Sequence, residues 1–354
     1  MSKQTDLIAL IREYQNLNHK TEIYFSLSTC LQMLCKQEVQ NIFTLTTGDV
    51  IELPEGIFNK HIDIDISEFV SFQPFVLDTV LISARNLEIY DKFNALDSIN
   101  KKTILTTRDP HNLFNEKPFL SIRAASLISE TGYTPDKDIV ESIRNSANKL
   151  KHTSGKVIWK ELQRLLKTQY PSIGIEFLRN TGVLQIILPE LYECLGVDQN
   201  IKYHKYTVYE HCLKACDCCE NNDIRLRFAA LIHDIGKPPT RAMGINGATF
   251  HKHEVAGSKM SQTIVSRFNI NEEDALFIIG LVSNHMYQYH RDWKDTTVKK
   301  FIRKTGITKE YLGRLEEFPL FKLRHADRRG RDLNPITQKQ TDFENRIEII
   351  LKAI

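Results

Sequence analysis

An apolar stretch that ends in a histidine and an aspartate constrains this chain most. Residues 228–237 read F-A-A-L-I-H-D-I-G-K, and the small and aliphatic side chains before His233 are typical of a tightly packed helix. Gly236 and Pro238 follow directly and are expected to end that helix. We therefore expect the His233 imidazole and the Asp234 carboxylate to be held rigidly at a helix end that faces a cleft.

This histidine-aspartate pair has the chemistry of a metal site. An imidazole and a carboxylate offer a divalent ion one nitrogen and one oxygen, and the carboxylate can bridge to a second ion. Two more candidates lie in segments that read as helix, His211 in Y-E-H-C-L-K-A and Asp327 in L-R-H-A-D-R-R-G-R. Four such ligands from three helices suit Mn, Fe, Ni, Zn or Mg and leave positions for water and substrate. The sequence therefore predicts a divalent metal ion bound by His211, His233, Asp234 and Asp327.

The composition is that of a globular protein with two or three domains. The chain has 354 residues, of which 42% are hydrophobic and 26% are charged, and its formal charge is +3. Because this charge is nearly balanced, any basic surface must be local. No apolar run reaches membrane-spanning length and the first six residues are polar apart from Met1, so we predict a cytoplasmic protein without membrane contact.

The seven cysteines allow two interpretations. An odd number in a chain of this length favours reduced thiols over disulfides. Cys212, Cys216 and Cys219 recur at the spacing of one helix face, with Cys218 beside them. This face is either a zinc or redox site or a buried stripe of small apolar side chains, and we favour the buried stripe.

The first hundred residues alternate short strands and helices, and the chain after Asp109-Pro110 is expected to be helical. A helix is expected over residues 5–20 and another over 31–36. Period-two patterns predict strands over residues 22–28, 41–47 and 61–67. Segments 75–85 and 87–92 continue this small α/β unit, and helices are expected over residues 136–150, 154–167 and 170–181.

This order of elements resembles the bacterial class II tRNA nucleotidyltransferases, the CCA-adding and poly(A) polymerase family. In that family a Gly-Gly turn after the first strand cradles the triphosphate, and an Asp-x-Asp pair on the second strand holds two magnesium ions. This sequence has Leu27-Ser28 at the first place and Ile-Phe-Thr, residues 42–44, at the second. Asp63 and Asp65 lie on one face of the expected third strand. They are either a displaced catalytic pair or the polar outer face of that strand.

A second family segment has also changed. Residues 116–124, E-K-P-F-L-S-I-R-A, resemble the family segment Glu-Asp-Pro-x-Arg-x-x-Arg-Ala, whose Asp and Arg select the incoming nucleotide. Lys117 and Leu120 stand at those two positions, so the acceptor and the donor are both missing. The resemblance therefore implies a head and neck that have lost nucleotide addition.

From His204 onward the sequence resembles the HD phosphohydrolase domain found at the C-terminus of some of those enzymes. The matching segments carry, in family order, His211, His233-Asp234, His253, His285 and Asp327. A polar stretch, residues 198–205, reads as a linker, and we place the boundary near Gly196. The expected fold class is α+β: a small mixed α/β nucleotidyltransferase-like head (1–112), a helical, RNA-binding-like neck and body (113–196) and an all-α HD domain (197–354).

Further residues are assigned roles around the expected metal ion. Lys237 is either a group that neutralises a phosphoryl oxygen or a solvated lysine, and His253 and His285 are candidates for a second metal ion or a general acid. We favour phosphate contacts for the basic group around Asp327, which comprises Arg324, Arg328, Arg329 and Arg331. An earlier basic group is either a solvated face or a phosphate-binding one: Arg291, Lys294, Lys299, Lys300, Arg303 and Lys304.

The leading hypothesis from these patterns is a metal-dependent phosphohydrolase. The resemblance implies a 2′,3′-cyclic phosphodiesterase and phosphatase that acts on RNA or tRNA 3′ ends or on nucleotides, with an inactive nucleotidyltransferase head as an RNA-docking platform. Two alternatives stay open: a catalytically inactive tRNA- or RNA-binding protein, and an active tRNA nucleotidyltransferase that uses Asp63 and Asp65.

Overall fold

The computed structural model describes residues 70–83, 89–199, 205–220, 222–244, 247–287, 289–334 and 336–353, together with four short strands before residue 60. The chain divides into two compact units. The first comprises Met1–Lys117 and Gly132–Ser142, and the second comprises Pro118–Thr131 and Ile143–Ile354. Most of the helical body therefore shares a unit with the HD region, whereas the division at residues 112 and 196 stays a prediction.

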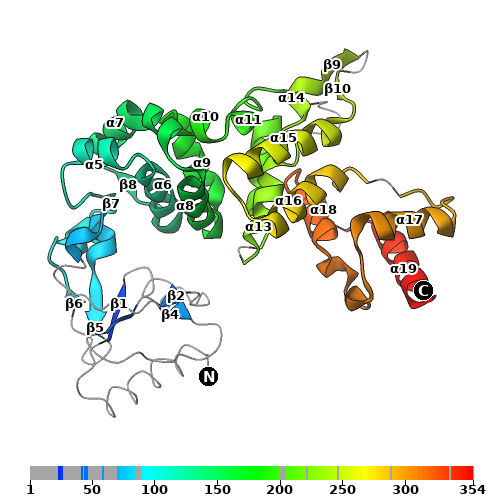
Figure 1. Cartoon of the computed structure of the whole chain (residues 1–354), viewed down its shortest axis with the longest axis horizontal. Helices are drawn as coiled ribbons and strands as arrows, with labels where there is room; N and C mark the ends of the chain where they lie inside the picture. Colours follow the sequence, from blue (N-terminus) through cyan, green and yellow to red (C-terminus); the bar gives the residue numbers. More distant parts are fainter. Residues whose placement is uncertain are drawn as a thin grey trace, which may run out of the picture. The chain divides into compact units, whose positions relative to one another are not determined.

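The first unit contains a four-stranded sheet with the order β3-β1-β5-β6, in which all neighbours are antiparallel. Its strands are β1 (Ile23–Ser26), β3 (Thr44–Thr46), β5 (Leu81–Ser83) and β6 (Ile89–Tyr90). Figure 1 labels three of these strands, β1, β5 and β6. The strand expected over 22–28 contains β1, and the one expected over 41–47 occurs as two short strands, β2 (Asn41–Ile42), which pairs with β4 (Phe58–Asn59), and β3. Segment 87–92 contains β6, and segment 75–85 contains a short 3-10 helix, Val76–Thr79, before β5. The expected strand 61–67, with Asp63 and Asp65, and the helices expected over 5–20 and 31–36 lie outside the described residues.

The helical body contains the three helices that the sequence predicts. Its elements are α5 (Pro110–Glu116), α6 (Leu120–Thr131), α7 (Lys137–Ser146), α8 (Gly155–Lys167), α9 (Pro171–Asn180), α10 (Val183–Ile187) and α11 (Pro189–Tyr192). Proline at the first position of α5, α9 and α11 sets the backbone angle of a helix start without losing an internal hydrogen bond. Helix α6 is buried on most sides and packs against α8 and α9.

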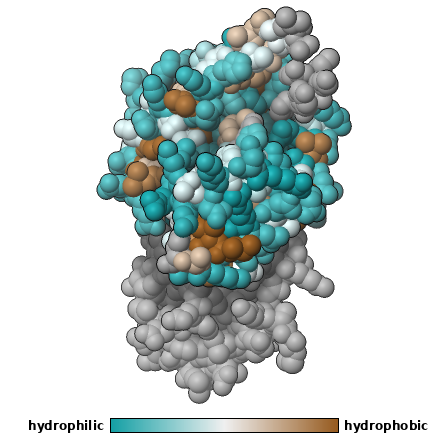
Figure 2. Space-filling model, turned by 90° about the vertical axis from the view of Figure 1, so that its right-hand side faces the viewer, coloured by the Kyte–Doolittle hydropathy of each residue, from teal (hydrophilic) through white to brown (hydrophobic). Residues whose placement is uncertain are grey.

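The HD region is helical apart from one hairpin. Its elements are α12 (Val208–Asp217), α13 (Ile224–Ile232), α14 (Lys237–Thr240), β9 (Arg241–Gly244), β10 (Gly247–Phe250), α15 (His253–Arg267), α16 (Glu272–Asn284), α17 (Asp295–Thr305), α18 (Pro319–Arg329) and α19 (Gln338–Ala353). The antiparallel β9–β10 hairpin is an addition to the expected all-helical domain. The face of the molecule on the side of α17 and α19 is mostly hydrophilic (Figures 1 and 2). Within the described ranges, every helix is too short or too polar to cross a membrane.

Aromatic packing joins the helical body to the HD region. Trp159 of α8 is buried, and its ring lies 4.9 Å from that of Phe228 on α13 and 6.3 Å from that of Phe268 after α15. These three side chains come from both sides of the expected domain boundary. The body and the HD region therefore share a hydrophobic core, which explains why they form one compact unit.

A buried arginine reinforces the same junction. Arg227 of α13 is 2% exposed and donates only to backbone carbonyl oxygens. Its acceptors are Leu166 O at 2.7 Å, Thr168 O, Gln169 O at 3.3 Å and Cys219 O at 2.9 Å. Three of them lie where α8 ends, because the last carbonyls of a helix have no partner within it. One guanidinium thus satisfies the end of a body helix and fixes it to the HD region.

Candidate metal centre

The four predicted ligands lie together in the interior of the HD region. His211 comes from α12, His233 and Asp234 follow the end of α13, and Asp327 comes from α18. All four are buried. His211 Nε2 lies 3.1 Å from both His233 Nε2 and Asp327 Oδ1, and His233 Nε2 lies 3.2 Å from Asp234 Oδ2. The structure therefore brings together the residues that the sequence pattern selects.

His253 and His285 form a second group on the other side of Asp234. Their Nε2 atoms are 3.2 Å apart. Asp234 Oδ1 lies 3.2 Å from His253 Nε2 and 3.5 Å from His285 Nε2, whereas Oδ2 faces His211 and His233. Two groups within ligand distance of one ion share this carboxylate: His211, His233 and Asp234, and Asp234, His253 and His285.

The hydrogen bonds of the other ring nitrogens fix the tautomers. His233 Nδ1 is 2.7 Å from Ala230 O, His253 Nδ1 is 2.8 Å from Phe250 O and His285 Nδ1 is 2.7 Å from Val282 O. A carbonyl oxygen can only accept, so each Nδ1 carries the proton and each Nε2 of a neutral ring exposes a lone pair. Two facing lone pairs repel, and a cation or a proton between them removes this repulsion. The donor set therefore fits a divalent ion.

Burial affects the charge of these groups in a consistent way. It lowers the pKa of His211 and of His285, which favours their neutral, ligating forms. Burial also acts to lower the pKa of His233, but the charges of Asp234 and Asp327 outweigh it and raise that pKa above its usual value. Protons and metal ions therefore compete most directly at His233.

Lys237 is not a solvated lysine, because its ammonium group lies inside the cluster. It is 6% exposed, and its Nζ donates to Asp234 Oδ2 and to Gln199 Oε1, both at 2.6 Å. Burial acts to raise the pKa of Asp234, but His233 and the Lys237 ammonium hold it well below its usual value. Lys237 therefore neutralises the central carboxylate in this structure, while its predicted catalytic role remains a prediction.

The arginines around Asp327 differ in their partners. Arg331 Nη2 lies 2.7 Å and Arg324 Nη1 lies 3.4 Å from Asp327 Oδ2. Arg328 donates from Nε to Asn334 O at 2.7 Å, and Arg329 is exposed. Two of the four thus balance a buried carboxylate, as guanidinium groups do in charge-assisted pairs. Their predicted role in substrate binding stays a prediction.

Gly236 allows the turn after Asp234 to approach α15. A Cβ atom at Gly236 would lie 2.0 Å from His253 O and 2.5 Å from Gly257 N. Its φ of −77° is open to any residue, so close approach rather than backbone freedom requires glycine here. Helix α13 ends at Ile232, before Gly236, and α14 begins directly after it. This close packing places His253 beside Asp234.

Sequence reasoning missed Gln199 and left the cysteine face open. Gln199 falls in the stretch that reads as a linker, yet it is buried and bonded to Lys237, 38 residues away. No local pattern marks such a pair. Burial raises the pKa of the Cys212, Cys216 and Cys219 thiols, the last to about 12. No cysteine belongs to either possible metal group in the described part of the chain, which agrees with the buried-stripe interpretation.

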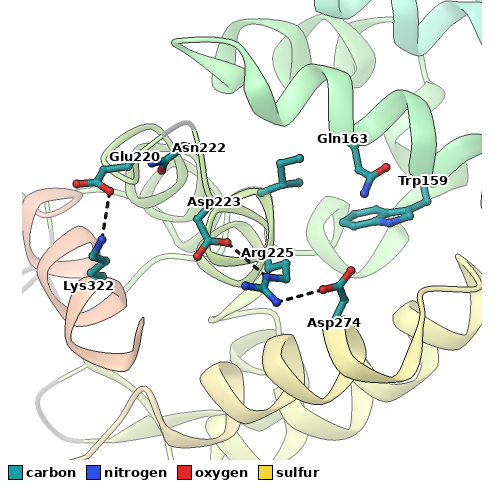
Figure 3. A pocket seen from close by; sticks show the side chains of 9 residues that line it. Trp159, Gln163, Glu220, Asn222, Asp223, Arg225, Asp274 and Lys322 are labelled. Carbon is teal, nitrogen blue, oxygen red and sulfur yellow. Dashed lines mark hydrogen bonds and ion pairs between the residues drawn. The ribbon is translucent and has the colours of Figure 1, made fainter. Parts of the chain in front are cut away.

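A separate hollow of about 470 Å³ opens where α8 meets the HD region (Figure 3). Arg225 lies in it between Asp223, at 3.7 Å, and Asp274, at 3.3 Å, and Lys322 binds Glu220 at 3.2 Å. With three carboxylates and two cations, both of them paired, this lining does not favour phosphate. None of the predicted site residues lies in it.

Two family models match adjacent parts of the chain. Residues 132–195 match the model described as "Probable RNA and SrmB- binding site of polymerase A", and residues 201–329 match the HD domain. The second match contains both histidine groups, Lys237 and Asp327. The chain therefore carries an HD domain, preceded by a helical segment that is similar to the RNA-binding part of polymerase A.

Curated relatives and solved structures extend these matches. The chain is 29% identical over 217 residues to the A-adding tRNA nucleotidyltransferase of Deinococcus radiodurans. This match covers 58% of the present chain and 49% of the Deinococcus protein. The chain is also 25% identical over 290 residues to the multifunctional CCA protein of Aliivibrio salmonicida, covering 78% and 69%. The fold is similar to that of the CCA-adding enzyme of Bacillus stearothermophilus, which was solved in complex with CTP. The TM-score is 0.62 at 14% sequence identity, and the superposition covers 98% of this chain and 82% of the other. The chain thus spans about half to two thirds of the length of these curated relatives.

The chain is thus similar to tRNA nucleotidyltransferases over much of its length and carries an HD domain at residues 201–329. This finding confirms the resemblance stated from the sequence, as well as the α+β fold class.

The same finding contradicts the main functional prediction, a phosphohydrolase with an inactive head. The relatives are named for A addition and for CCA, not for hydrolysis, so that prediction is wrong. The error has a physical cause. The prediction of an inactive head rests on the residues at 27–28 and 42–44 and on Lys117 and Leu120. Element order alone does not fix strand register, and a shift of one residue exchanges the two faces of a strand. In addition, a buried cluster of possible metal ligands does not by itself specify which reaction a protein catalyses.

Proposed function

We propose that this protein transfers nucleotides to the 3′ end of tRNA. The observation that carries this proposal is the similarity to relatives named A-adding tRNA nucleotidyltransferase and multifunctional CCA protein. The RNA-binding model matched at residues 132–195 supports the same partner. The proposed substrates are therefore tRNA and a nucleoside triphosphate.

The reaction requires one bond exchange at phosphorus. A hydroxyl oxygen at the RNA 3′ end forms a bond to the α-phosphorus of the triphosphate, the bond from that phosphorus to the bridging oxygen breaks, and pyrophosphate leaves with its electron pair. The hydroxyl proton passes to solvent or to a carboxylate. In this proposal Asp63 and Asp65 hold divalent ions, which supply charge neutralisation at the phosphates when bound.

We further propose that the HD cluster binds one or two divalent ions. The first position uses His211, His233, Asp234 and Asp327, and a second uses Asp234, His253 and His285. The converging Nε2 atoms support this proposal, since their Nδ1 protons are already committed to carbonyl oxygens. A bound ion would supply Lewis-acid chemistry there. Mixed nitrogen and oxygen donors accept Mn, Ni, Mg, Fe or Zn.

The transfer proposal is tested with a tRNA transcript that lacks its terminal nucleotides and with labelled ATP or CTP. We expect the wild-type chain to add label, and the double variant Asp63→Asn, Asp65→Asn to lose this activity while it still binds tRNA. Asp97→Asn is a matched control, because Asp97 is an exposed carboxylate that pairs with Lys101 on the surface. Equal incorporation by the double variant and the wild type would refute the assignment of the carboxylates.

A second candidate function is tRNA binding without transfer. It is supported by Lys117 and Leu120, which stand where the family has its nucleotide-selecting aspartate and arginine. Tight binding of tRNA, with no label added from either triphosphate under any of the five metals, would favour this candidate and contradict the first.

A further inference from the structure

One face of α17 carries four basic side chains. Successive helical residues are about 100° apart around the axis, which places Lys299, Lys300, Arg303 and Lys304 within an arc of about 140°. Val298 and Ile302 lie on the opposite side and are buried. The helix therefore packs through an apolar face and presents a basic face outward. We call these four residues the α17 basic face.

The α17 basic face lacks the acidic partners that neighbouring cations have. Lys300, Arg303 and Lys304 are exposed and Lys299 is half-buried. Arg291 binds Asp342 at 2.5 Å, and Arg346 binds Asp295, the single acid of α17, at 2.8 Å. Among the residues that the structure describes, no ion pair joins a carboxylate to any of the four.

This arrangement does not serve the stability of the helix. Lys299 and Arg303, and likewise Lys300 and Lys304, are four residues apart, and like charges at this spacing repel. The dipole at the C-terminal end of the helix favours cations in the last turn, which benefits Arg303 and Lys304 but not the other two. A bound polyanion would turn this repulsion into attraction.

We propose that the α17 basic face binds the phosphate backbone of tRNA as a contact surface additional to the helical body. The proposal rests on the tRNA partner of the proposed function. The RNA-binding model covers residues 132–195 and leaves α17 outside. Net charge does not account for the face either, since the whole chain carries only +3.

The chemistry of the face favours phosphate over bases. Phe301, the aromatic residue of α17, points into the core, where its ring lies 5.0 Å from Phe343 and 5.4 Å from Tyr287. No aromatic ring is therefore available on α17 for base stacking, and lysine and arginine heads contact phosphate oxygens without reading sequence. Binding at this face should be strongly dependent on salt and tolerant of RNA sequence.

The test uses the full chain and a tRNA transcript, with affinity measured by fluorescence anisotropy at several salt concentrations. The α17 variant replaces the three exposed cations: Lys300→Gln, Arg303→Gln and Lys304→Gln. A matched control removes the same charge from exposed positions elsewhere in the same compact unit: Arg241→Gln, Lys252→Gln and Lys259→Gln. Circular dichroism checks that both variants keep their helices.

We expect the α17 variant to bind tRNA roughly 10- to 100-fold more weakly at physiological salt, and its slope of log Kd against log salt to fall by about 2 to 3, because each phosphate contact releases about one counterion. The control should lose less than about threefold. An α17 variant that binds like the control, or a wild-type chain that does not bind tRNA, would overturn the proposal. Tight tRNA binding without nucleotide incorporation would instead refute only the proposed transfer activity.

Discussion

Replacing Arg227 by methionine tests whether the helical body and the HD region are stabilised as one unit. Methionine keeps the apolar stem and fits a buried site, but it removes every donor of the guanidinium. Three acceptors in buried hydrogen bonds lose their partner: Leu166 O, Thr168 O and Cys219 O. Water cannot replace the guanidinium there because Arg227 is 2% exposed.

The expected loss follows from these three carbonyl groups. A buried polar group left without a hydrogen bond costs about 1–3 kcal/mol, so three of them cost at least about 3 kcal/mol. Removing the guanidinium also removes its own desolvation cost, which keeps the net loss near the lower limit. For a unit of this size, about 3 kcal/mol corresponds to a decrease in Tm of roughly 6–12 °C.

The assay is thermal unfolding of the full chain, followed by circular dichroism and by tryptophan fluorescence, since Trp159 lies in the core that the two regions share. The control is Arg225→Met on the same helix. Arg225 is 36% exposed and forms surface ion pairs, which contribute less than about 1 kcal/mol. Equal Tm values for the two variants would refute the argument that Arg227 ties the body to the HD region.

Three further predictions concern the HD cluster. Mn²⁺ or another divalent ion should raise the Tm of the wild type but not of Asp234→Asn, because both Asp234 oxygens face imidazole nitrogens. A wild-type protein that no divalent ion stabilises would contradict the proposed site. Metal affinity should decrease as the pH falls through the raised pKa of His233, because the ion must displace the proton that His233 then carries. Calorimetry should show proton release on metal binding, and an affinity independent of pH would disprove this prediction. Gln199→Leu should weaken metal binding by roughly 10- to 100-fold, since Lys237 then bonds to Asp234 alone, whereas Gln163→Leu should leave it unchanged.

The ligand cluster could be predicted from the sequence because each member lies in a short local pattern. The apolar helix before His233 and the basic segment around Asp327 are readable within about ten residues, and the order of the segments resembles a known domain. Contacts between distant side chains were not readable in this way. The hydrogen bond of Gln199 to Lys237 does not follow from spacing, because these two residues are 38 positions apart and are joined only by burial in the folded protein.

The fold is predictable from the sequence where an apolar periodicity extends over many residues. It is poorly predictable where tertiary packing determines the structure. Helices over 154–167 and 170–181 carry clear apolar faces and occur as expected. The β9–β10 hairpin is not marked by any such periodicity. The joining of the body and the HD region in one unit likewise depends on contacts between distant residues, such as that between Trp159 and Phe228. The functional prediction failed for a different reason, since it relied on missing motifs rather than on residues that are present.

The pairing of Lys237 with Asp234 and of Arg331 with Asp327 also has a consequence for metal binding at the proposed site. The two buried carboxylates are each matched by a cation, so the cluster is electrically balanced without any ion. Small zinc modules behave differently, because their ligands fold only around the metal. We therefore predict that folding and metal binding at the proposed site are separate events, so that a chelator should remove a bound ion without unfolding the protein.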